Sequence, residues 1–394
     1  MENAFNYFCN GACCTFFVYE AYFYFLRRKQ QRFYRTCAYI MIFWAILLIK
    51  DPFYLIFEHN KPIYDLLMLI DMSALFTCSF YCIELLSPQK VTWKRISTHT
   101  APYLITLAIY TFRPEQWAFN LSIYGMSAYC VIIICYLIRL TIEHKKAVAN
   151  NFSDTSPADI RWLWQAVSIF LVLLSPWILI CYYKNPITDG LYYLAIIAVW
   201  GLTTYHTHRQ DLRLSEVRSI MTEDLTQEKP DKQYAPNFDK EVEELFHHKK
   251  IHHDPHLTLA RVALLIGTNR NYFSYYLNNS LNVNFFDFIN GFRLEDAEQM
   301  LNDPNCKLSQ DTIAQNVGFN SLSTFRRAFF KKYGMTPNQF RKGGGGVEMQ
   351  GVWSNKQRSH PIYPLRQNLY SFQQKHQLQH FSYCPFFCSS LILA

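Results

Sequence analysis

Motifs for catalysis and cofactor binding are missing from this sequence. It contains no glycine-rich nucleotide loop, no nucleophile paired with a base, and no full set of metal ligands at a recognised spacing. The four histidines of "HHKKIHHD" (247–254) leave metal binding open, but a solvated helix end needs no further ligand and is the simpler interpretation. We therefore expect no enzymatic activity, no cofactor and no bound metal.

Charged residues are also scarce, and they are unevenly placed. They make up 17% of the 394 residues, whereas half of the chain is apolar. Residues 1–205 are overwhelmingly apolar and aromatic, and charge concentrates after Tyr205. Length and composition together indicate two or three domains, of which the first has the composition of a protein embedded in lipid.

The apolar half has no disulfide framework, although it is rich in cysteine. Its nine cysteines have the spacing of neither a disulfide-rich domain nor a zinc site. We expect them to pack as small apolar side chains within helices. These residues are Cys9, Cys13, Cys14, Cys37, Cys78, Cys82, Cys130, Cys135 and Cys181.

Long apolar stretches predict a polytopic helical membrane bundle of about seven spans. A spanning helix needs about 20 mainly apolar residues, and the second and fourth stretches are short by that measure. The seven stretches are Ala4–Leu26, Thr36–Leu48, Ile63–Leu86, Thr98–Phe112, Trp117–Leu140, Ala166–Tyr183 and Leu191–Tyr205.

The charges between these stretches predict the orientation of the chain. No basic region precedes the first apolar run, so we expect a retained anchor and not a removable signal peptide. Loops one, three and five carry five, three and three Lys or Arg residues, whereas loops two, four and six carry two, one and one. Because Lys and Arg collect on the cytoplasmic side, the N-terminus is expected outside a bacterial inner membrane and everything after Tyr205 in the cytoplasm.

Ionisable side chains inside predicted spans are the candidate signal-sensing residues. Such groups are costly in lipid and often mark functional sites. Four such residues, Glu20, Asp65, Asp71 and Glu84, lie in the predicted spans. Asp71, well inside the third stretch, and Glu20, in the first, are the candidates for signal sensing, whereas Asp65 is expected near the outer interface and Glu84 near the basic inner loops. The alternative for Asp71 is a polar group that a neighbouring helix satisfies.

Two short units in the polar half are typical of helix-turn-helix elements. Residues 206–237, with Pro230 and Pro236, predict a linker that extends the last span and then loosens. In "LTLARVALLIGTNRNYFSYYLNN", Thr258 and Asn269 are predicted N-caps and Gly267 a turn residue between two helices. The sequence thus predicts a short helix, a tight turn and a second amphipathic helix.

The second unit, "DTIAQNVGFNSLSTFRRAFFKKYGMTPNQFRK" (311–342), repeats this plan. Gly318 is the predicted turn residue and Ser321 the predicted cap of the following helix. The exposed side of that helix is expected to present Ser323, Thr324 and Arg327. From Arg326 onward the segment holds six basic residues and no acid, which is typical of a DNA-reading element.

A predicted helix, "FFDFINGFRLEDAEQMLND" (285–303), separates the two units. At 1.5 Å per residue about twenty helical residues span roughly 30 Å. One turn of B-DNA measures about 34 Å. A rigid spacer of this length therefore suits two reading helices in successive major grooves on one face of the duplex.

Together, "IAQNVGF", "STFRRAFFKKYGMTPNQFR" and "FRLEDAEQML" resemble the AraC/XylS-type helix-turn-helix family over Phe238–Lys342. The resemblance implies an all-α DNA-binding domain with two reading helices and a role in transcriptional control. The first unit departs from the commoner family pattern, because Arg270 is the one basic residue of its reading helix. The DNA-binding residues that the resemblance implies are Arg270, Asn271, Tyr275, Ser323, Thr324, Arg327 and Lys331.

Charge placement predicts that the two helix-turn-helix elements contribute differently to DNA binding. Residues 238–342 hold 13 Lys and Arg against 11 Asp and Glu, a net charge of +2, and the basic residues gather in the second unit. We expect that unit to supply more of the salt-dependent affinity. The polar, aromatic and unperiodic residues 343–394 indicate a tail that is either disordered or a read-through product.

The sequence as a whole predicts a membrane-tethered, sequence-specific transcriptional regulator. Its predicted parts are a membrane domain (1–205), a linker (206–237), a DNA-binding domain (238–342) and the tail. The expected partners are double-stranded DNA and the bilayer, with RNA polymerase, a second copy of the chain and an unknown ligand or membrane partner as further candidates. The alternative is a membrane transporter or receptor whose helix-turn-helix tail binds a protein.

Overall fold

A computed structural model describes residues 2–57, 59–183, 185–226 and 237–343, and within them the chain is helical. The described residues contain no β-strand beyond an isolated bridge between Phe152 and Thr258. The predicted all-α fold class is thus confirmed for the described part of the chain. The predicted tail at 343–394 lies, except for Gly343, outside the described residues.

The chain divides into two compact units, and their boundaries differ from the domain boundaries predicted from the sequence. The first unit comprises Met1–Ala147 and Ser156–Gln227, and the second Val148–Thr155 and Glu228–Ala394. The helix that opens the predicted linker therefore belongs to the first unit. A piece of the fifth loop, in turn, belongs to the second unit. Sequence alone gave no sign of either assignment.

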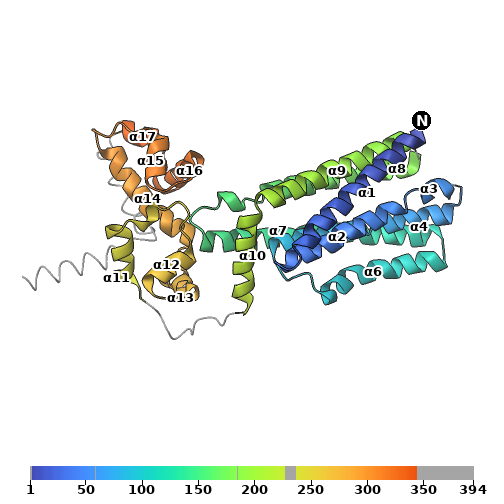
Figure 1. Ribbon diagram of the computed structural model, residues 1–394, viewed down its shortest axis with the longest axis horizontal. Coiled ribbons are helices and arrows are strands. Elements are labelled where there is room, and N and C mark those ends of the chain that lie inside the picture. The colour runs from blue at the N-terminus through green and yellow to red at the C-terminus, as the bar shows by residue number, and fades with distance from the viewer. Residues whose placement is uncertain (1, 58, 184, 227–236, 344–394) are drawn as a thin grey trace, which may run out of the picture. The chain divides into compact units, whose positions relative to one another are not determined.

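The first unit is built from long helices that run alongside one another (Figure 1). Within it α1 packs against α2 and α9, and α9 also packs against α8. Its helices are α1 (Glu2–Leu26), α2 (Arg32–Ile49), α3 (Phe53–Ile56), α4 (Lys61–Asp71), α5 (Ala74–Leu86), α6 (Trp93–Phe112), α7 (Gln116–Asn151, ending in the second unit), α8 (Arg161–Tyr183), α9 (Pro186–Arg209) and α10 (Asp211–Thr226).

Four helical segments among the described residues are long and apolar enough to cross a membrane. They are Arg32–Ile49, Lys61–Leu86, Gln116–Asn151 and Pro186–Arg209. The other three predicted spans coincide with α1, α6 and α8, which this criterion does not include. In α6, Lys94 and Arg95 fall in the first turn and leave a shorter apolar stretch. The apolar helices thus suggest a membrane domain, and seven crossings are not established.

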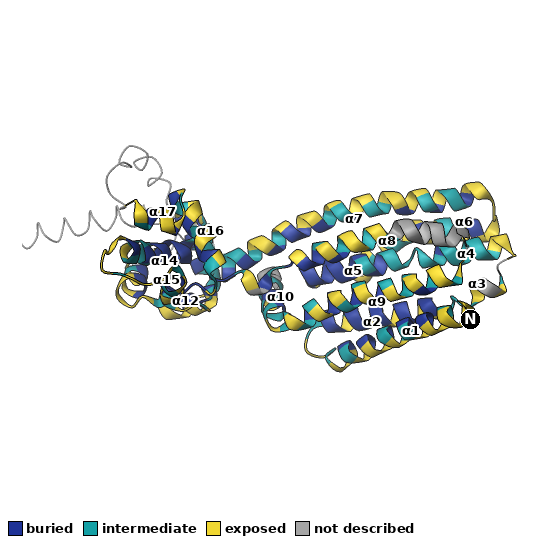
Figure 2. Cartoon of the chain, turned by 90° about the horizontal axis from the view of Figure 1, so that it is seen from above, coloured by how far each residue is buried: buried dark blue, intermediate teal, exposed yellow. Residues whose placement is uncertain are grey.

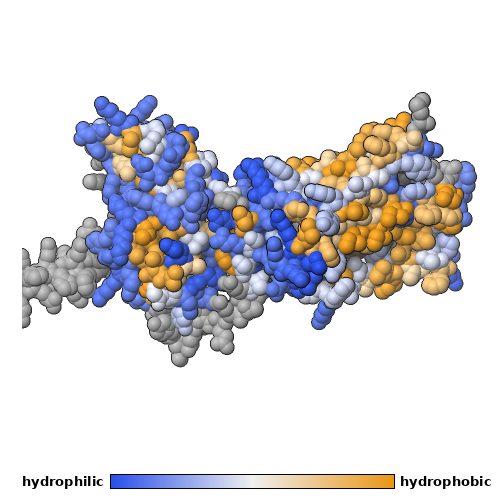
Figure 3. All heavy atoms as spheres, viewed as in Figure 1, coloured by the Kyte–Doolittle hydropathy of each residue, from blue (hydrophilic) through white to orange (hydrophobic). Residues whose placement is uncertain are grey.

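The outer surface of the first unit is apolar. Figure 3 shows hydrophobic side chains over much of the face in view, and Figure 2 shows exposed residues along the outer helices, while α5 is buried along most of its length. Contiguous apolar surface of this kind marks contact with a partner or with lipid. Exposed examples from different helices are Phe8, Tyr19, Ile46, Ile132 and Val172.

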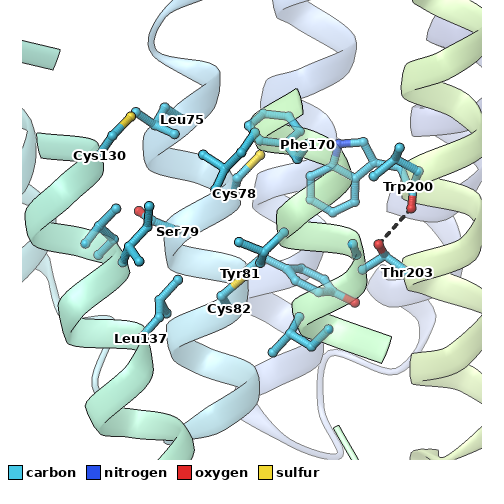
Figure 4. A pocket seen from close by; sticks show the side chains of 17 residues that line it. Leu75, Cys78, Ser79, Tyr81, Cys82, Cys130, Leu137, Phe170, Trp200 and Thr203 are labelled. Carbon is cyan, nitrogen blue, oxygen red and sulfur yellow. Dashed lines mark hydrogen bonds between the residues drawn. The ribbon is translucent and has the colours of Figure 1, made fainter. Parts of the chain in front are cut away.

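Cys9, Cys13, Cys37 and Cys82 are buried, as predicted, whereas Cys135 is exposed and the side chain of Cys181 lies outside the described part of the chain. Cys78, Cys82 and Cys130 line a narrow apolar cavity of ≈ 70 Å³ together with Phe170 and Trp200 (Figure 4). The cysteines whose side chains the structure describes are free thiols. The buried sulfur atoms therefore fill space between helices, as the sequence indicated.

The second unit consists of two small helical subdomains joined by one long helix. α14 contributes Phe288 and Phe292 to the first hydrophobic core and Leu294 and Ala297 to the second. The helices are α11 (Asp239–Val242, continued by a π-helical turn, Glu243–His248), α12 (Leu259–Ile266), α13 (Arg270–Tyr275, continued by Tyr276–Ser280), α14 (Phe285–Asn302), α15 (Gln310–Asn316), α16 (Leu322–Tyr333) and α17 (Pro337–Lys342).

Candidate functional site

The first helix-turn-helix has the predicted local structure. The side chain of Thr258 accepts a hydrogen bond from the backbone of Arg261 at 3.3 Å and caps α12. Asn269 caps α13 by accepting from the backbone of Tyr272 at 2.9 Å. Between them Gly267 has φ = 83°, a left-handed conformation that glycine adopts without steric cost.

The second helix-turn-helix repeats the arrangement. Ser321 caps α16 by accepting from the backbone of Thr324 at 3.2 Å. The turn residue Gly318 has φ = 95°, and a Cβ placed there would lie 2.7 Å from the carbonyl oxygens of His252 and His253. Glycine is therefore required both by backbone conformation and by the close approach of the first subdomain.

Helix α14 fixes the distance between the two reading helices. It has 18 residues and, at 1.5 Å per residue, measures about 27 Å. Because its side chains are buried in both cores, each subdomain is held to the same rod. The predicted rigid spacer is thus present, and it begins and ends close to the expected residues.

Most residues assigned to the second reading helix lie where they can reach DNA. Ser323, Arg327 and Lys331 are exposed on α16. Lys331 forms an ion pair with Asp287 of α14 at 2.9 Å, and its side chain is 72% exposed. Exposed pairs of this kind contribute little to stability, so the lysine can exchange its carboxylate for a phosphate.

Thr324 is an exception to the predicted exposed side. The prediction that it is exposed is wrong, because it is 7% exposed and its hydroxyl accepts a hydrogen bond from Ser321. One residue is 100° of helix rotation, so Thr324, beside the buried Phe325, turns toward the core. Its predicted contact with a base stays a prediction and would require a local change.

The first reading helix presents less charge. Arg270, Asn271 and Tyr275 are all partly exposed. Arg270 is the first residue of α13, and its guanidinium donates a hydrogen bond to the side-chain oxygen of Asn151 at 3.1 Å. A predicted DNA-binding residue is therefore already hydrogen-bonded to Asn151, the last residue of α7.

Sequence reasoning missed the contribution of Val148–Thr155, which we call the inserted segment. Phe152 is 2% exposed, and the backbone N–H of Ser153 donates to the carbonyl of Leu257 at 3.1 Å. The only sequence signal is a single aromatic residue in the polar stretch "ANNFSDTS". The sequence does not show that this aromatic side chain is buried in the second unit.

Arg293 of α14 donates hydrogen bonds to the inserted segment. It is 1% exposed and donates to the carbonyls of His252 and Asp254, each at 2.8 Å, and to the carbonyl and hydroxyl oxygens of Ser153, each at 3.2 Å. Burial lowers the pKa of Arg293 to about 10, and Asp154 and Asp254 oppose that shift. The guanidinium therefore stays charged at neutral pH.

One group of described residues in the second unit has the composition of a metal site. Ligand atoms of His252, His253 and Asp296 lie within 4.8 Å of one another. The ammonium of Lys250 lies 3.3 Å from the same carboxylate. Burial disfavours the charge on Asp296, but hydrogen bonds from both histidines outweigh it and hold its pKa below the usual range. The carboxylate thus already has cationic and hydrogen-bonding partners of its own.

A second candidate site is a cavity of ≈ 500 Å³ in the first unit. Asp51, Asp71 and Asp189 line it, and none of its described lining residues is Lys, Arg or His. Lys50 forms ion pairs with Asp51 at 2.8 Å and Asp71 at 2.5 Å, and Tyr54 donates to Asp71. Asp71 thus has polar partners in Lys50 and Tyr54, in line with the alternative that neighbouring residues satisfy it. It also lines the cavity.

The second predicted sensing residue lies elsewhere. Glu20 is 6% exposed, and its carboxylate lies 3.1 Å from Nε2 of His208. It is not among the residues that line the cavity. Its sensing role stays a prediction, and the observed pair is enough to account for a buried acid in α1.

Comparisons with known proteins bear on the second unit. Residues 262–343 match a family model described as a helix-turn-helix domain. Over 97 residues the chain is 31% identical to the Msm operon regulatory protein of Streptococcus mutans serotype c (strain ATCC 700610 / UA159), covering 24% of this chain and 34% of that protein. The chain thus spans about a third of the length of this relative. No solved structure matches it.

These likenesses agree with the geometry of the second unit. Residues 262–343 match a helix-turn-helix domain, and together with the operon-regulator relative this match supports a DNA-binding regulator of transcription. Double-stranded DNA is the partner that this domain supports. The membrane association of the first unit is suggested by its apolar helices alone.

Proposed function

We propose that this chain regulates transcription while tethered to the bacterial inner membrane. The observation that carries the proposal is one polypeptide with four membrane-length apolar helices and an AraC-type reading domain. The charges of the loops favour an N-terminus outside and a reading domain in the cytoplasm. A second copy of the chain and RNA polymerase stay predicted partners.

A combined experiment on the intact chain tests this proposal. A reporter enzyme inserted after Tyr205 is expected to be active only as a cytoplasmic fusion, because the chain is proposed to end inside. In the same cells, crosslinking is expected to recover particular chromosomal fragments with the intact protein. Periplasmic reporter activity would overturn the topology, and uniform recovery of all sequences would overturn specific DNA binding.

The alternative functions make different demands. A protein-binding helix-turn-helix would leave the affinity for DNA unchanged when Arg327 is replaced, while regulation in cells would fail. A transporter would need broken helices and internal repeats. One break is present, since α4 ends at Asp71 and α5 begins at Ala74. We take this break as support for a ligand site at Asp71 within a sensor.

The cavity is proposed as the sensing site, and its chemistry favours a positively charged organic molecule. Three carboxylates with one ammonium leave a net charge of about −2, by Asp51, Asp71 and Asp189 against Lys50. Asp71 also ends α4, where the helix dipole is negative. Aromatic walls suit organic cations by cation–π attraction. The rings that provide them include Trp44, Tyr54, Tyr64, Tyr124 and Tyr193.

Tryptamine and its neutral analogue tryptophol test the sign of the charge. We expect the purified full chain in detergent to bind tryptamine about tenfold more tightly, because a charge-assisted contact contributes about 1.5–3 kcal/mol. Isothermal titration calorimetry measures both affinities. Asp189→Asn is expected to remove most of the difference, since Oδ1 of Asp189 is buried with no hydrogen-bond partner among the described residues.

Asp65→Asn provides the matched control for this experiment. Asp65 lies on α4 like Asp71, but it accepts a hydrogen bond from Tyr110 and does not line the cavity. Its replacement is expected to leave both affinities unchanged. Equal affinities for tryptamine and tryptophol, or no binding of either, would contradict a cation site.

A further inference from the structure

The inserted segment, Val148–Thr155, touches both helix-turn-helix units at the start of their reading helices. The side chain of Asn151 accepts from Arg270, the first residue of α13, at 3.1 Å. The side chain of Asp154 accepts from Asn320 at 2.7 Å, and Asn320 directly precedes the cap of α16. One short piece of chain therefore contacts the same end of both reading helices.

The segment is built into the unit and does not merely lie against it. Asn151, Phe152, Ser153 and Asp154 are each less than 10% exposed. The hydroxyl of Ser153 donates to the carbonyl of Pro255 and accepts from Arg293. Such a packed and hydrogen-bonded arrangement has a defined bound state, which a switch between two conformations requires.

The contacts of the segment fall on groups that DNA would use. Helix-turn-helix proteins direct the N-terminal residues of the reading helix toward the base edges. Arg270 is the one basic residue of α13, and Asn151 holds its guanidinium. The carboxylate of Asp154 places a negative charge beside the start of α16, where phosphate groups would approach. DNA and the segment therefore compete for the same end of each reading helix.

We propose that the inserted segment is an autoinhibitory cover, which must leave the reading helices before the domain binds DNA tightly. This inference rests on the proposed DNA-binding function. When the cover leaves, Arg293 loses its bonds to Ser153 but keeps those to His252 and Asp254. The buried guanidinium thus retains partners in the uncovered state.

Helix α7 supplies a route from the signal to the cover. It lines the cavity of the first unit with Asn120 and Tyr124 and runs without interruption to Asn151. A ligand that favours one position of α7 would thereby favour one position of the cover. A ligand shifts such an equilibrium only by as much as it prefers one state.

Variants on the segment side of each contact test the cover without altering the reading helices. The affinity of the full chain in detergent for a fluorescein-labelled duplex, selected by the wild-type chain from a random-sequence pool, is measured by fluorescence anisotropy. Asn151→Ala and Asp154→Ala are each expected to bind about tenfold more tightly, because each loses one charged or charge-assisted contact that competes with DNA. The double variant is expected to bind more tightly still.

Asn150→Ala is the matched control. Asn150 is a partly exposed neighbour of Asn151 on the same helix, and its replacement is expected to leave affinity unchanged. A segment that only completes the fold would give the opposite result for Asn151→Ala and Asp154→Ala, namely weaker binding or no change. Failure of every variant and of the wild type to bind any duplex would remove the DNA-binding function itself, and the cover with it.

Hydrogen exchange gives a second measurement that needs no variant. The backbone N–H of Ser153 donates to the carbonyl of Leu257 at 3.1 Å, so it is expected to exchange slowly in the free full chain. Adding the selected duplex is expected to speed its exchange at least several-fold, because the cover leaves. Exchange at Ser153 that stays the same or slows while DNA is bound would overturn the proposal.

Discussion

Arg327→Ala is expected to lower the affinity for a selected duplex by about 10- to 100-fold, which corresponds to the roughly 1–3 kcal/mol that one arginine contact to a base contributes. Arg327 is exposed on α16 and lies four residues after the exposed Ser323, so both side chains are on one face of the helix. Affinity for unselected duplex is expected to fall much less. Fluorescence anisotropy at several salt concentrations measures both quantities.

Arg326→Ala separates base reading from the loss of one charge. Arg326 is the preceding residue on the same helix, but its Nε donates to Gln310 of α15 at 3.1 Å. Its loss is expected to weaken selected and unselected duplexes equally and to reduce the slope of affinity against salt by about one. If Arg327→Ala behaved in this same way, Arg327 would be a phosphate contact and the reading of bases would lie elsewhere.

Arg293→Ala is expected to destabilise the second unit by about 3–5 kcal/mol, because it removes the donor of the buried carbonyls of His252 and Ser153 and one of the two donors to the carbonyl of Asp254. The carbonyls of His252, Asp254 and Ser153 all accept from this one side chain. Since each 1 kcal/mol shifts the melting temperature of a domain of this size by about 4–8 °C, the unit should melt more than 10 °C lower. Hydrogen exchange of α14 amides in the full chain follows this unit specifically.

Arg261→Ala provides the comparison for this variant. Arg261 is exposed on α12 in the same unit, and we expect its replacement to change stability by less than about 0.5 kcal/mol. Arg293→Lys keeps the charge but offers one compact donor group, so an intermediate loss is expected. Similar stability of Arg293→Ala and Arg261→Ala would mean that water or a rearranged loop replaces the buried hydrogen bonds.

Local sequence was enough to place the helices of the second unit, because N-caps and turn glycines act over only a few residues. Thr258, Asn269 and Ser321 were predicted as caps and cap the expected helices. Gly267 and Gly318 were predicted as turn residues and have positive φ. Caps and turns depend on hydrogen bonds between near neighbours, so a sequence without a structure is sufficient to place them.

Exposure within those helices was harder to predict. Thr324 was expected on the exposed side and is buried. It lies at the border of its helix's apolar face, where the partner across the core decides which way the residue turns. A rotation of 100° per residue leaves little margin at such a border.

The sequence by itself determined that an apolar, helical half precedes a helix-turn-helix domain, since composition and short-range pattern carry that information. Only the tertiary structure decided that Phe152 and Ser153, more than a hundred residues before α14, are buried in the second unit and that Ser153 accepts a hydrogen bond from Arg293. Only it brought Asp51, Asp71 and Asp189 around one cavity. Contacts between residues this far apart depend on how whole helices pack, and no local pattern records that packing.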